Sequence, residues 1–270
     1  MLQQTQVGRV QSKLPEFLKQ FPTIKSLAHS SRADVLRVWK GMGYNNRAVR
    51  LQQCAKIIVE KYGGKIPTIK EQLLALPGIG EYTSSAISVF AFQKNFSVVD
   101  VNIRRVYSRI LWKMKTFSNL QTEKKISETA NKIFPNGKSS EWHQAIMDIG
   151  SQFCLARKAH CELCPLKSLC VSANRMECVP SQANKEKLFY GKPFRYWRGR
   201  VVEALRAVRA QTYLSEQLVL KKIFLKQSKA RANLLSAIIV ALEKDNIIEM
   251  KYGNDKLQKR IRLNNSKQQQ

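Results

Sequence analysis

Four of the six cysteines fall within seventeen consecutive residues, CLARKAHCELCPLKSLC. They are Cys154, Cys161, Cys164 and Cys170, with the spacing C-x6-C-x2-C-x5-C. Thiolates are soft ligands that suit zinc or iron–sulfur clusters. Zinc sites usually contain two C-x2-C pairs, and this loop has one. The spacing within a single loop therefore favours an iron–sulfur cluster, with zinc as the alternative.

The surroundings of these cysteines fit a metal better than disulfides. No apolar run reaches 18 residues, and the first ten residues contain no secretory apolar region. We therefore expect an intracellular protein without membrane segments, in which clustered cysteines bind metal. A metal would hold the loop rigid, so that Arg157, Lys158 and Lys167 could meet phosphates. Cys178 lies further on and is not expected to be a ligand.

The chain is strongly basic, with 47 Lys and Arg against 19 Asp and Glu, a formal net charge of +28. Both parts share the excess: 27 basic and 12 acidic residues in 1–178, and 20 and 7 in 179–270. A globular chain this positive most often binds a polyanion. We expect nucleic acid rather than an acidic membrane surface, because no amphipathic helix with a large exposed apolar face is evident.

Residues 1–178 show helical periodicity and no alternating strand pattern. Apolar residues recur at helical spacing in three segments: 31–42, 47–62 and 102–112. Thr68 and Glu71 predict a capping box ahead of a further short helix. We therefore expect a mainly α-helical domain over 1–178.

The pattern changes after a linker at 179–195. Two helical segments, RGRVVEALRAVRA and NLLSAIIVALEKD, precede a predicted β-hairpin around Gly253–Asn254–Asp255. Helices followed by a basic hairpin favour a winged-helix-like α+β domain over 196–270, a variant of the helix-turn-helix. A generic small packing module is the alternative.

The segment LPGIGEYT places Gly78 and Gly80 on either side of Ile79, immediately before a helix. Glycine permits a tight turn and a close backbone approach. The N–H groups at the start of the next helix suit a phosphate. This pattern predicts a helix-hairpin-helix that grips the DNA backbone without reading sequence. An ordinary glycine corner between helices is the alternative.

Asp100 stands between the apolar stretch SVV and a predicted helix. It is expected to cap that helix, accepting hydrogen bonds from the first N–H groups. The same position stabilises an ionised carboxylate through those donors and the helix dipole. Asp100 could therefore also stabilise a cationic sugar, and the two roles are compatible.

Six segments together resemble the helix-hairpin-helix (endonuclease III-like) superfamily of DNA glycosylases, and within it the MutY-type adenine glycosylases. They are MLQQTQV, WKGMGYNNRAVRL, LPGIGEYT, VVDVNIRRV, HQAIMDIG and the four-cysteine loop, in the family order over about residues 1–172. The resemblance implies a helix-hairpin-helix glycosylase fold and a [4Fe–4S] cluster on the four cysteines. It also implies a mismatch-containing double-stranded DNA partner. No heptad seam or other oligomer signal is visible in the sequence, so we expect a monomer, with a cytoplasmic, nucleoid-associated location if the protein is bacterial.

The resemblance also assigns roles to single residues. Asp100 matches the aspartate that stabilises the oxocarbenium-like sugar. Tyr82 stands where strand-cutting relatives carry a Schiff-base lysine, which implies a monofunctional glycosylase. Gln144 matches a contact to the flipped adenine. Leu2, Gln4 and Tyr44 match residues that wedge into the duplex, where Tyr44 as plain core is the alternative.

Three departures complicate this picture. The proton-donating glutamate of MutY-type enzymes lies two residues before the methionine that is residue 1 here, so we expect a start assigned downstream of the true one, or a crippled paralogue. The usual C-terminal domain, which reads 8-oxoguanine, is not recognisable. Val101 stands where MutY-type enzymes commonly carry glycine. Thymine-mismatch glycosylases of the same superfamily tolerate other residues at this position.

These observations predict a base-excision repair enzyme that removes adenine mispaired with guanine or 8-oxoguanine after base flipping. The alternatives are a thymine glycosylase acting on T:G mismatches, and a non-catalytic DNA-binding protein.

Overall fold

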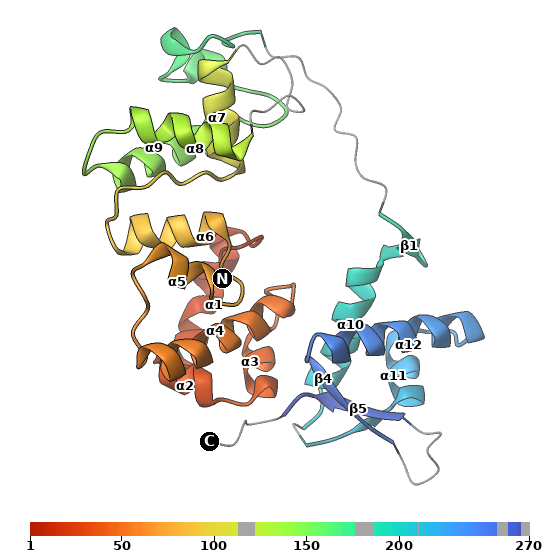
Figure 1. Ribbon diagram of the computed structural model, residues 1–270. Coiled ribbons are helices and arrows are strands. Elements are labelled where there is room, and N and C mark those ends of the chain that lie inside the picture. Colours follow the sequence, from red (N-terminus) through yellow and green to blue (C-terminus); the bar gives the residue numbers. More distant parts are fainter. Residues whose placement is uncertain (113–121, 176–185, 210, 253–258, 266–270) are drawn as a thin grey trace. The chain divides into compact units, whose positions relative to one another are not determined.

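The structure is a computed structural model that describes residues 1–112, 122–175, 186–209, 211–252 and 259–265 (Figure 1). The chain divides into two compact units. The N–C unit comprises Met1–Ile66 and Lys185–Gln270, and the middle unit comprises Pro67–Asn184. These units are defined by how the chain packs and do not test which segments fold independently. The domain boundaries expected at 178 and 196 therefore stay a prediction.

The N-terminal part of the N–C unit is helical. Its helices are α1 (Val7–Gln20), α2 (Ile24–His29), α3 (Arg32–Val38) and α4 (Asn46–Tyr62). The Ser31 side chain caps α3 by accepting the Asp34 N–H, and α4 ends at Gly63 in the left-handed conformation. The helices predicted over 31–42 and 47–62 are confirmed, although the first ends at Val38. Trp39, just beyond it, is still buried.

The C-terminal part has the expected winged-helix-like architecture. In chain order it contains β1 (Leu188–Phe189), β2 (Lys192–Pro193), α10 (Phe194–Arg206), β3 (Leu214–Ser215), α11 (Glu216–Ile223), α12 (Lys229–Lys244), β4 (Ile248–Tyr252) and β5 (Lys259–Leu263). Strands β3, β4 and β5 form an antiparallel sheet with the order β3-β5-β4. The predicted β-hairpin is confirmed, and its turn lies outside the described residues. The small β1–β2 hairpin lies within the expected linker.

One hydrophobic core joins the two parts of the N–C unit. Leu36 and Trp39 from the N-terminal helices belong to the same buried cluster as Val201, Leu235 and Ile261 from the C-terminal part. Each of these side chains is essentially inaccessible to water. Burial of apolar surface contributes about 25 cal/mol per Å². The C-terminal part is therefore packed onto the first helices rather than tethered beside them.

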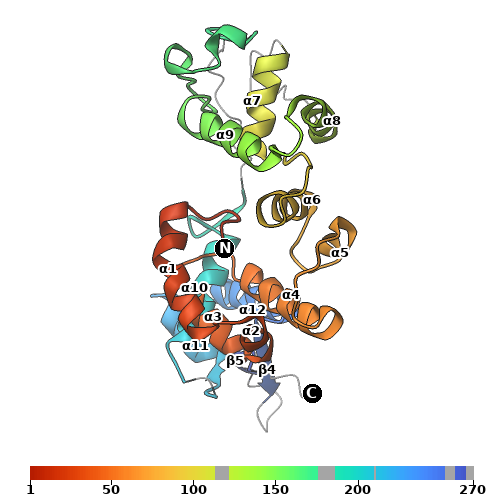
Figure 2. The ribbon, with the colours of Figure 1, turned by 90° about the vertical axis from the view of Figure 1, so that its left-hand side faces the viewer.

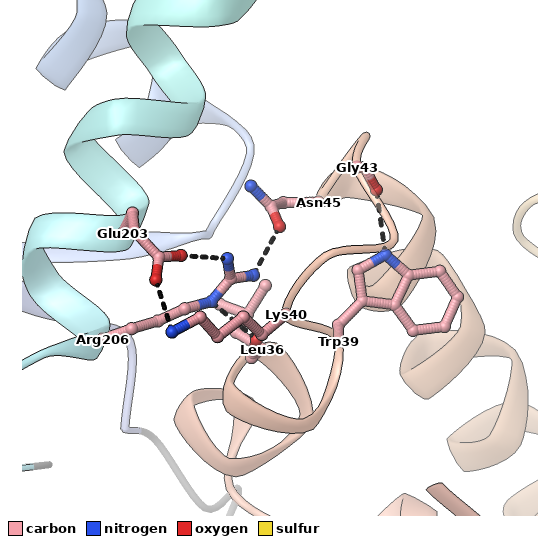
Figure 3. Close-up of polar contacts among 7 residues, drawn as sticks. All are labelled: Leu36, Trp39, Lys40, Gly43, Asn45, Glu203 and Arg206. Carbon is pink, nitrogen blue, oxygen red and sulfur yellow. Dashed lines mark hydrogen bonds and ion pairs between the residues drawn. The ribbon is translucent and has the colours of Figure 1, made fainter. Parts of the chain in front are cut away.

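Polar contacts fix α10 against the end of α3, as Figure 3 shows. The Arg206 guanidinium donates to the Leu36 carbonyl (2.8 Å), to Asn45 Oδ1 (2.7 Å) and to Glu203 Oε2 (3.1 Å). Lys40 Nζ lies 2.9 Å from the other oxygen of Glu203. A planar guanidinium with several directed bonds fixes orientation better than a single ion pair does.

A second polar contact lies nearby. Asp245 accepts a hydrogen bond from Asn46 Nδ2 (2.9 Å) and pairs with Arg198. Burial alone would raise the pKa of Asp245, but the bonds from Asn46 and Arg198 and the Arg198 charge outweigh it and lower that pKa. Burial likewise acts to raise the pKa of Glu203, and its bonds from Lys40 and Arg206 lower it overall.

These lowered pKa values predict an acid-sensitive N–C unit. A carboxylate whose folded-state pKa lies below its unfolded value, about 4, stabilises the fold above that pH. The stabilisation is lost as the pH falls through the folded pKa. We expect the melting temperature of the unit to stay level between pH 7 and 5 and to fall below about pH 4. Thermal unfolding monitored across this range measures it.

The control is a comparison of two variants. The double change Asp245→Asn with Glu203→Gln is expected to reduce the fall in melting temperature below about pH 4, because the two titrating carboxylates are gone. Glu243→Gln, on the exposed face of α12, is expected to keep the wild-type profile. If the melting temperature of the double variant falls in acid as much as that of the wild type, Asp245 and Glu203 do not cause the acid sensitivity.

The middle unit contains five helices and two short turns of 3₁₀-helix among its described residues. They are α5 (Lys70–Leu74), α6 (Glu81–Ala86), α7 (Val101–Leu111), α8 (Glu123–Ile133), α9 (Ser139–Gln152), and the turns Cys161–Leu163 and Lys167–Leu169. Helix α6 continues as a π-helical turn, Ile87–Ala91. The predicted capping box is wrong: Ile69 precedes α5, and no side chain caps it.

Helices α7 and α9 pack closely, side by side in Figures 1 and 2. Gly150 of α9 lies at the contact. A Cβ atom there would lie 2.9 Å from Asn102 Cβ, closer than real Cβ contacts, and 3.3 Å from Val106 Cγ2, which is tight. Glycine is therefore required at 150 by the neighbouring helix. Among the described residues, no helix is long and apolar enough to cross a membrane.

Gly150→Ala is expected to destabilise the middle unit by about 1–3 kcal/mol, the usual cost of overpacking a core. The added methyl meets the root of a side chain, which cannot rotate away. Chemical denaturation measures the change. Gly8→Ala in α1 is the control, because a Cβ at Gly8 meets nothing within 4 Å, and it is expected to be neutral or stabilising. Equal effects of the two changes would contradict this view of the contact.

Candidate functional site

The two hairpin glycines serve different purposes. Gly78 has φ +83°, a conformation that strongly favours glycine. Gly80 precedes α6 with an extended backbone, and a Cβ there would meet nothing within 4 Å. The chain thus turns at Gly78 and leaves open space over the start of α6 at Gly80. This geometry suits a close approach by a phosphate, and the role of both glycines stays a prediction.

Asp100 caps α7 as predicted. Its Oδ1 accepts the Ile103 N–H at 2.6 Å, and its Oδ2 accepts from Asn102 Nδ2 at 3.1 Å. Two donors and the start of a helix stabilise a negative charge at this position. The Asp100 carboxylate is therefore held in one orientation and is half-buried.

Tyr82 lies within the electrostatic reach of Asp100. Burial raises the pKa of the Tyr82 phenol, and the charge of Asp100 raises it further. Both effects keep the hydroxyl protonated, so that at neutral pH it can donate a hydrogen bond. The two predicted catalytic residues, Tyr82 of α6 and Asp100 at the start of α7, thus interact electrostatically.

Gln144 lies on the exposed face of α9, away from the core. Its amide nitrogen donates to Asp148 Oδ1, one turn further on, at 3.3 Å. Asp148 is exposed as well, so it is not a buried carboxylate bonded inside the fold. The amide of Gln144 is accessible and keeps free capacity for both a donor and an acceptor contact.

Leu2, Gln4 and Tyr44 all belong to the N–C unit and are all exposed. Leu2 is 59% and Tyr44 51% accessible, so the alternative of Tyr44 as core is wrong. Gln4 and Tyr44 both have positive φ, at +54° and +43°. Non-glycine residues adopt this conformation infrequently, and it often accompanies functional loops. An exposed apolar or aromatic tip on a fixed loop suits insertion between bases.

Arg47 holds these tips together, and the sequence analysis missed it. Its guanidinium donates to three oxygens of the first five residues: Met1 O (3.0 Å), Gln3 O and Thr5 Oγ1 (2.7 Å). It also donates to Met42 O (2.7 Å) in the loop before α4. It also lies over the Tyr44 ring, 5.6 Å from the centroid. Arg47 therefore links the segment with Leu2 and Gln4 to the loop with Tyr44.

The four clustered cysteines line one cavity in the middle unit. Apolar side chains, including Ile110 and Ile149, form part of its wall. Burial raises the pKa of Cys170, as do the charges of the other three thiolates, against a hydrogen bond from the Ser172 main chain. Within the described residues, no three His, Cys, Asp or Glu side chains converge on the position of a single ion. The thiols instead surround a space, and Cys178 lies outside the described residues.

Two buried arginines of α7 support the cysteine loop. Arg105 donates to the carbonyls of Cys154 (2.6 Å) and Gly150 (2.6 Å). Arg109 donates to the Leu155 carbonyl (2.8 Å) and lies 3.3 Å from Cys154 Sγ. Both are at most 4% exposed. A guanidinium beside sulfur stabilises a thiolate, so this donor set fits a negatively charged metal–thiolate group.

Comparison with known proteins identifies the family. The model of the HhH-GPD superfamily base excision DNA repair protein matches residues 1–136. This chain belongs to that superfamily. The resemblance to adenine glycosylases is confirmed as well: relatives named adenine DNA glycosylase are 35% identical over 197 residues in Buchnera aphidicola subsp. Baizongia pistaciae and 33% identical over 207 residues in Mycobacterium tuberculosis.

Coverage of these HhH-GPD relatives is partial. The alignments include 73% and 77% of this chain, and 56% and 68% of the two relatives. Among solved structures, a thermostable thymine-DNA glycosylase matches with a TM-score of 0.59 and 29% identity, over 64% of this chain and 79% of that one. An endonuclease III–DNA complex matches with a TM-score of 0.57 at 23% identity, over 63% and 78%, which supports the fold alone.

Proposed function

We propose that this chain is an adenine DNA glycosylase of base-excision repair. It removes adenine mispaired with guanine or 8-oxoguanine, by hydrolysis of the N-glycosidic bond after the base is flipped out of double-stranded DNA. It acts as a monomer on DNA inside the cell. The adenine DNA glycosylases among its relatives support this proposal, and the observation that carries it is the Asp100 carboxylate, which two hydrogen bonds hold in one orientation at the start of α7.

Asp100 supplies negative charge where the reaction develops positive charge. Loss of adenine leaves an oxocarbenium-like sugar, which a fixed carboxylate stabilises. The hydrogen bonds from Ile103 and Asn102 preorganise Asp100, so that little reorganisation is needed as the charge develops.

Tyr82 makes the enzyme monofunctional. A lysine there would attack the sugar and form a Schiff base, whereas a protonated phenol does not. Its hydroxyl can instead donate a hydrogen bond, since its pKa is raised by burial and by Asp100. Water, rather than a protein side chain, then attacks the cationic sugar and completes the hydrolysis. Borohydride is accordingly expected to trap no covalent complex with the DNA.

The remaining residues bind and orient the substrate. The main chain around Gly78 and Gly80 grips a phosphate, and Gln144 contacts the flipped adenine. Leu2, Gln4 and Tyr44 fill the space that the base has left. The turn at Gly78, the exposed amide of Gln144 on α9, and the exposed Leu2, Gln4 and Tyr44 side chains support these roles.

Cys154, Cys161, Cys164 and Cys170 would hold a [4Fe–4S] cluster, which when bound would supply a rigid cross-link of the loop. The cluster has no redox step in this reaction. The loop exposes Arg157 and Lys158 toward solvent, where they can meet phosphates. Lys167 already pairs with Glu162, so its contribution to DNA binding is smaller than the sequence suggested.

The test is single-turnover release of adenine from a duplex with one A:8-oxoguanine pair, beside A:G and T:G duplexes. The expected result is release of adenine and no release of thymine, with slower release from this chain than from one that also carries the proton-donating glutamate. Release of thymine alone would favour the second candidate, a T:G glycosylase, for which the solved thymine-DNA glycosylase structure argues. The same assay on the chain extended in frame upstream of Met1 tests the expected start. Binding without release by either form would leave a non-catalytic DNA-binding protein.

A further inference from the structure

A large groove lies within the N–C unit, between the loop Gly41–Asn46 and α10. Its volume is about 860 Å³, within the range of roughly 300–1,000 Å³ of ligand-binding clefts. The loop is the one that carries Tyr44. None of the proposed roles above uses the α10 side of this groove.

The groove is strongly basic. Of the described residues that line it, five are arginines and none is acidic. Arg195, Arg198 and Arg206 are already paired with carboxylates. The other two, Arg9 on α1 and Arg200 on α10, form no ion pair with a carboxylate of the described residues.

Arg9 and Arg200 keep their charge available from opposite walls. Within the described parts of the chain, the Arg9 guanidinium donates to the Gly41 carbonyl alone, at 3.3 Å, so its charge has no negative partner there. Arg200 is exposed and forms no hydrogen bond or ion pair with any part of the chain that the structure describes. Two such guanidinium groups across one groove select an anion, and a guanidinium can bind phosphate, like carboxylate, through two parallel hydrogen bonds.

Two tyrosines add aromatic surface to the same groove. Tyr44 projects from the loop, and Tyr196, 41% exposed, projects from α10. Tyr196 packs edge-on against Trp197, and Lys192 Nζ lies over its ring, 5.6 Å from the centroid. A groove with cations and exposed aromatic rings is typical of single-stranded nucleic acid sites, where bases stack and phosphates follow the cations.

The walls are held at a fixed separation. Arg206 of α10 binds Asn45, the neighbour of Tyr44 in the loop, and Arg198 binds Asp245 together with Asn46 (Figure 3 shows the first). A site with rigid walls loses little conformational entropy when a strand enters.

The helix that usually reads DNA offers a poorer surface. In a helix-turn-helix the second helix enters the major groove, and α12 occupies that place here. The exposed residues at its centre are Asn233, Ala237 and Val240, none of them charged. The exposed charged residues of α12 lie near its ends, at Lys229, Glu243 and Lys244, so the middle of α12 offers DNA less positive charge than α10 does.

We propose that the groove between the Gly41–Asn46 loop and α10 is a second DNA site, which holds an unstacked stretch of strand. Arg9 and Arg200 bind its phosphates, and Tyr44 and Tyr196 stack on its bases. The inference rests on the proposed function only in taking DNA as the partner.

The test measures binding of the full chain to a labelled single-stranded oligonucleotide and to a mismatched duplex, across a range of salt concentrations. Tyr196→Ala is expected to weaken single-strand binding about tenfold, through the loss of one stacked base. Arg200→Ala is expected to make the slope of log Kd against log salt shallower by about 0.7, the loss of one phosphate contact on a single strand.

Matched controls come from the same part of the chain. Lys221→Ala and Tyr252→Ala remove the same kinds of group from exposed positions that do not line the groove. Both are expected to bind like the wild type. If these two weaken binding while Arg200→Ala and Tyr196→Ala do not, DNA contacts α11 and the β-hairpin instead, and the proposal is overturned.

Binding and catalysis separate the two proposals. Weaker binding by the groove variants of a chain that releases no adenine would uphold the groove and reject the glycosylase. If the chain releases adenine and the groove variants bind DNA like the wild type, the glycosylase is upheld and the groove is rejected. A polyglutamate peptide that binds the wild type but not the groove variants, while DNA binding is unaffected, would assign the groove to an acidic protein and overturn the proposal.

Discussion

Asp100→Asn is expected to slow single-turnover adenine release by about 10²–10³-fold, the usual loss when one preorganised electrostatic group is removed. The asparagine oxygen can still accept the Ile103 N–H, so the cap of α7 persists. Only the negative charge is lost, and with it the stabilisation of the cationic sugar. The rate is measured with the A:8-oxoguanine duplex, beside the melting temperature.

Two further variants separate charge from capping. Asp100→Ala removes the cap as well and is expected to cost about 1 kcal/mol of stability in addition. Asp34→Asn removes an exposed negative charge at the start of α3 and is expected to leave the rate unchanged. A rate for Asp100→Asn close to that of the wild type would reduce Asp100 to a helix cap.

Cys161→Ser is expected to have the second large effect, loss of the cluster from the cysteine loop. Four thiolates are needed to hold about four iron atoms, and a hydroxyl is a poor substitute. Iron per chain is expected to fall from about four to well below one. DNA affinity is expected to drop about tenfold, since Arg157 and Lys158 lose their fixed positions. Iron analysis and a binding titration measure the two effects.

Cys54→Ala provides the matched control. Cys54 is buried in α4 and burial raises the pKa of its thiol, as expected of an inert core cysteine. This variant is expected to keep its iron and its DNA affinity. Full iron content in Cys161→Ser, or one zinc per chain in the wild type, would refute the cluster.

The predictions that depended on local pattern succeeded. Helices α4 and α7 follow from apolar residues at helical spacing, and the Asp100 cap follows from a short acceptor ahead of such a pattern. The predicted β-hairpin follows from alternation across a turn. Each signal lies within about twenty residues, so no distant contact was needed to interpret it.

The capping box failed because local sequence permits several starts for a short helix. Thr68 and Glu71 have the right spacing, yet α5 begins after Ile69. Helix α11 was missed because its eight residues are too few to show a period. In both cases neighbouring elements, rather than intrinsic preference, determine where the helix lies.

The buried arginines were missed for a different reason. Arg105 and Arg109 lie four residues apart on the inner face of α7, and a charged residue is normally assigned to the surface. Their partners are mostly main-chain carbonyls of the 150–156 segment, which carry no sequence signature. The i, i+4 spacing on an otherwise apolar stripe was the available signal.

The shared core of the N–C unit has a consequence for synthesis of the chain. Arg32 bonds to the carbonyl of Asn246, 214 residues later, and the apolar residues around α3 have partners equally distant. At about 5–20 residues per second, the ribosome needs roughly 10–40 s to make that stretch. The first helices therefore leave the ribosome long before their partners exist. During that interval their apolar faces stay uncovered and prone to aggregation, and the core of this unit is completed only after the ribosome has made Leu263.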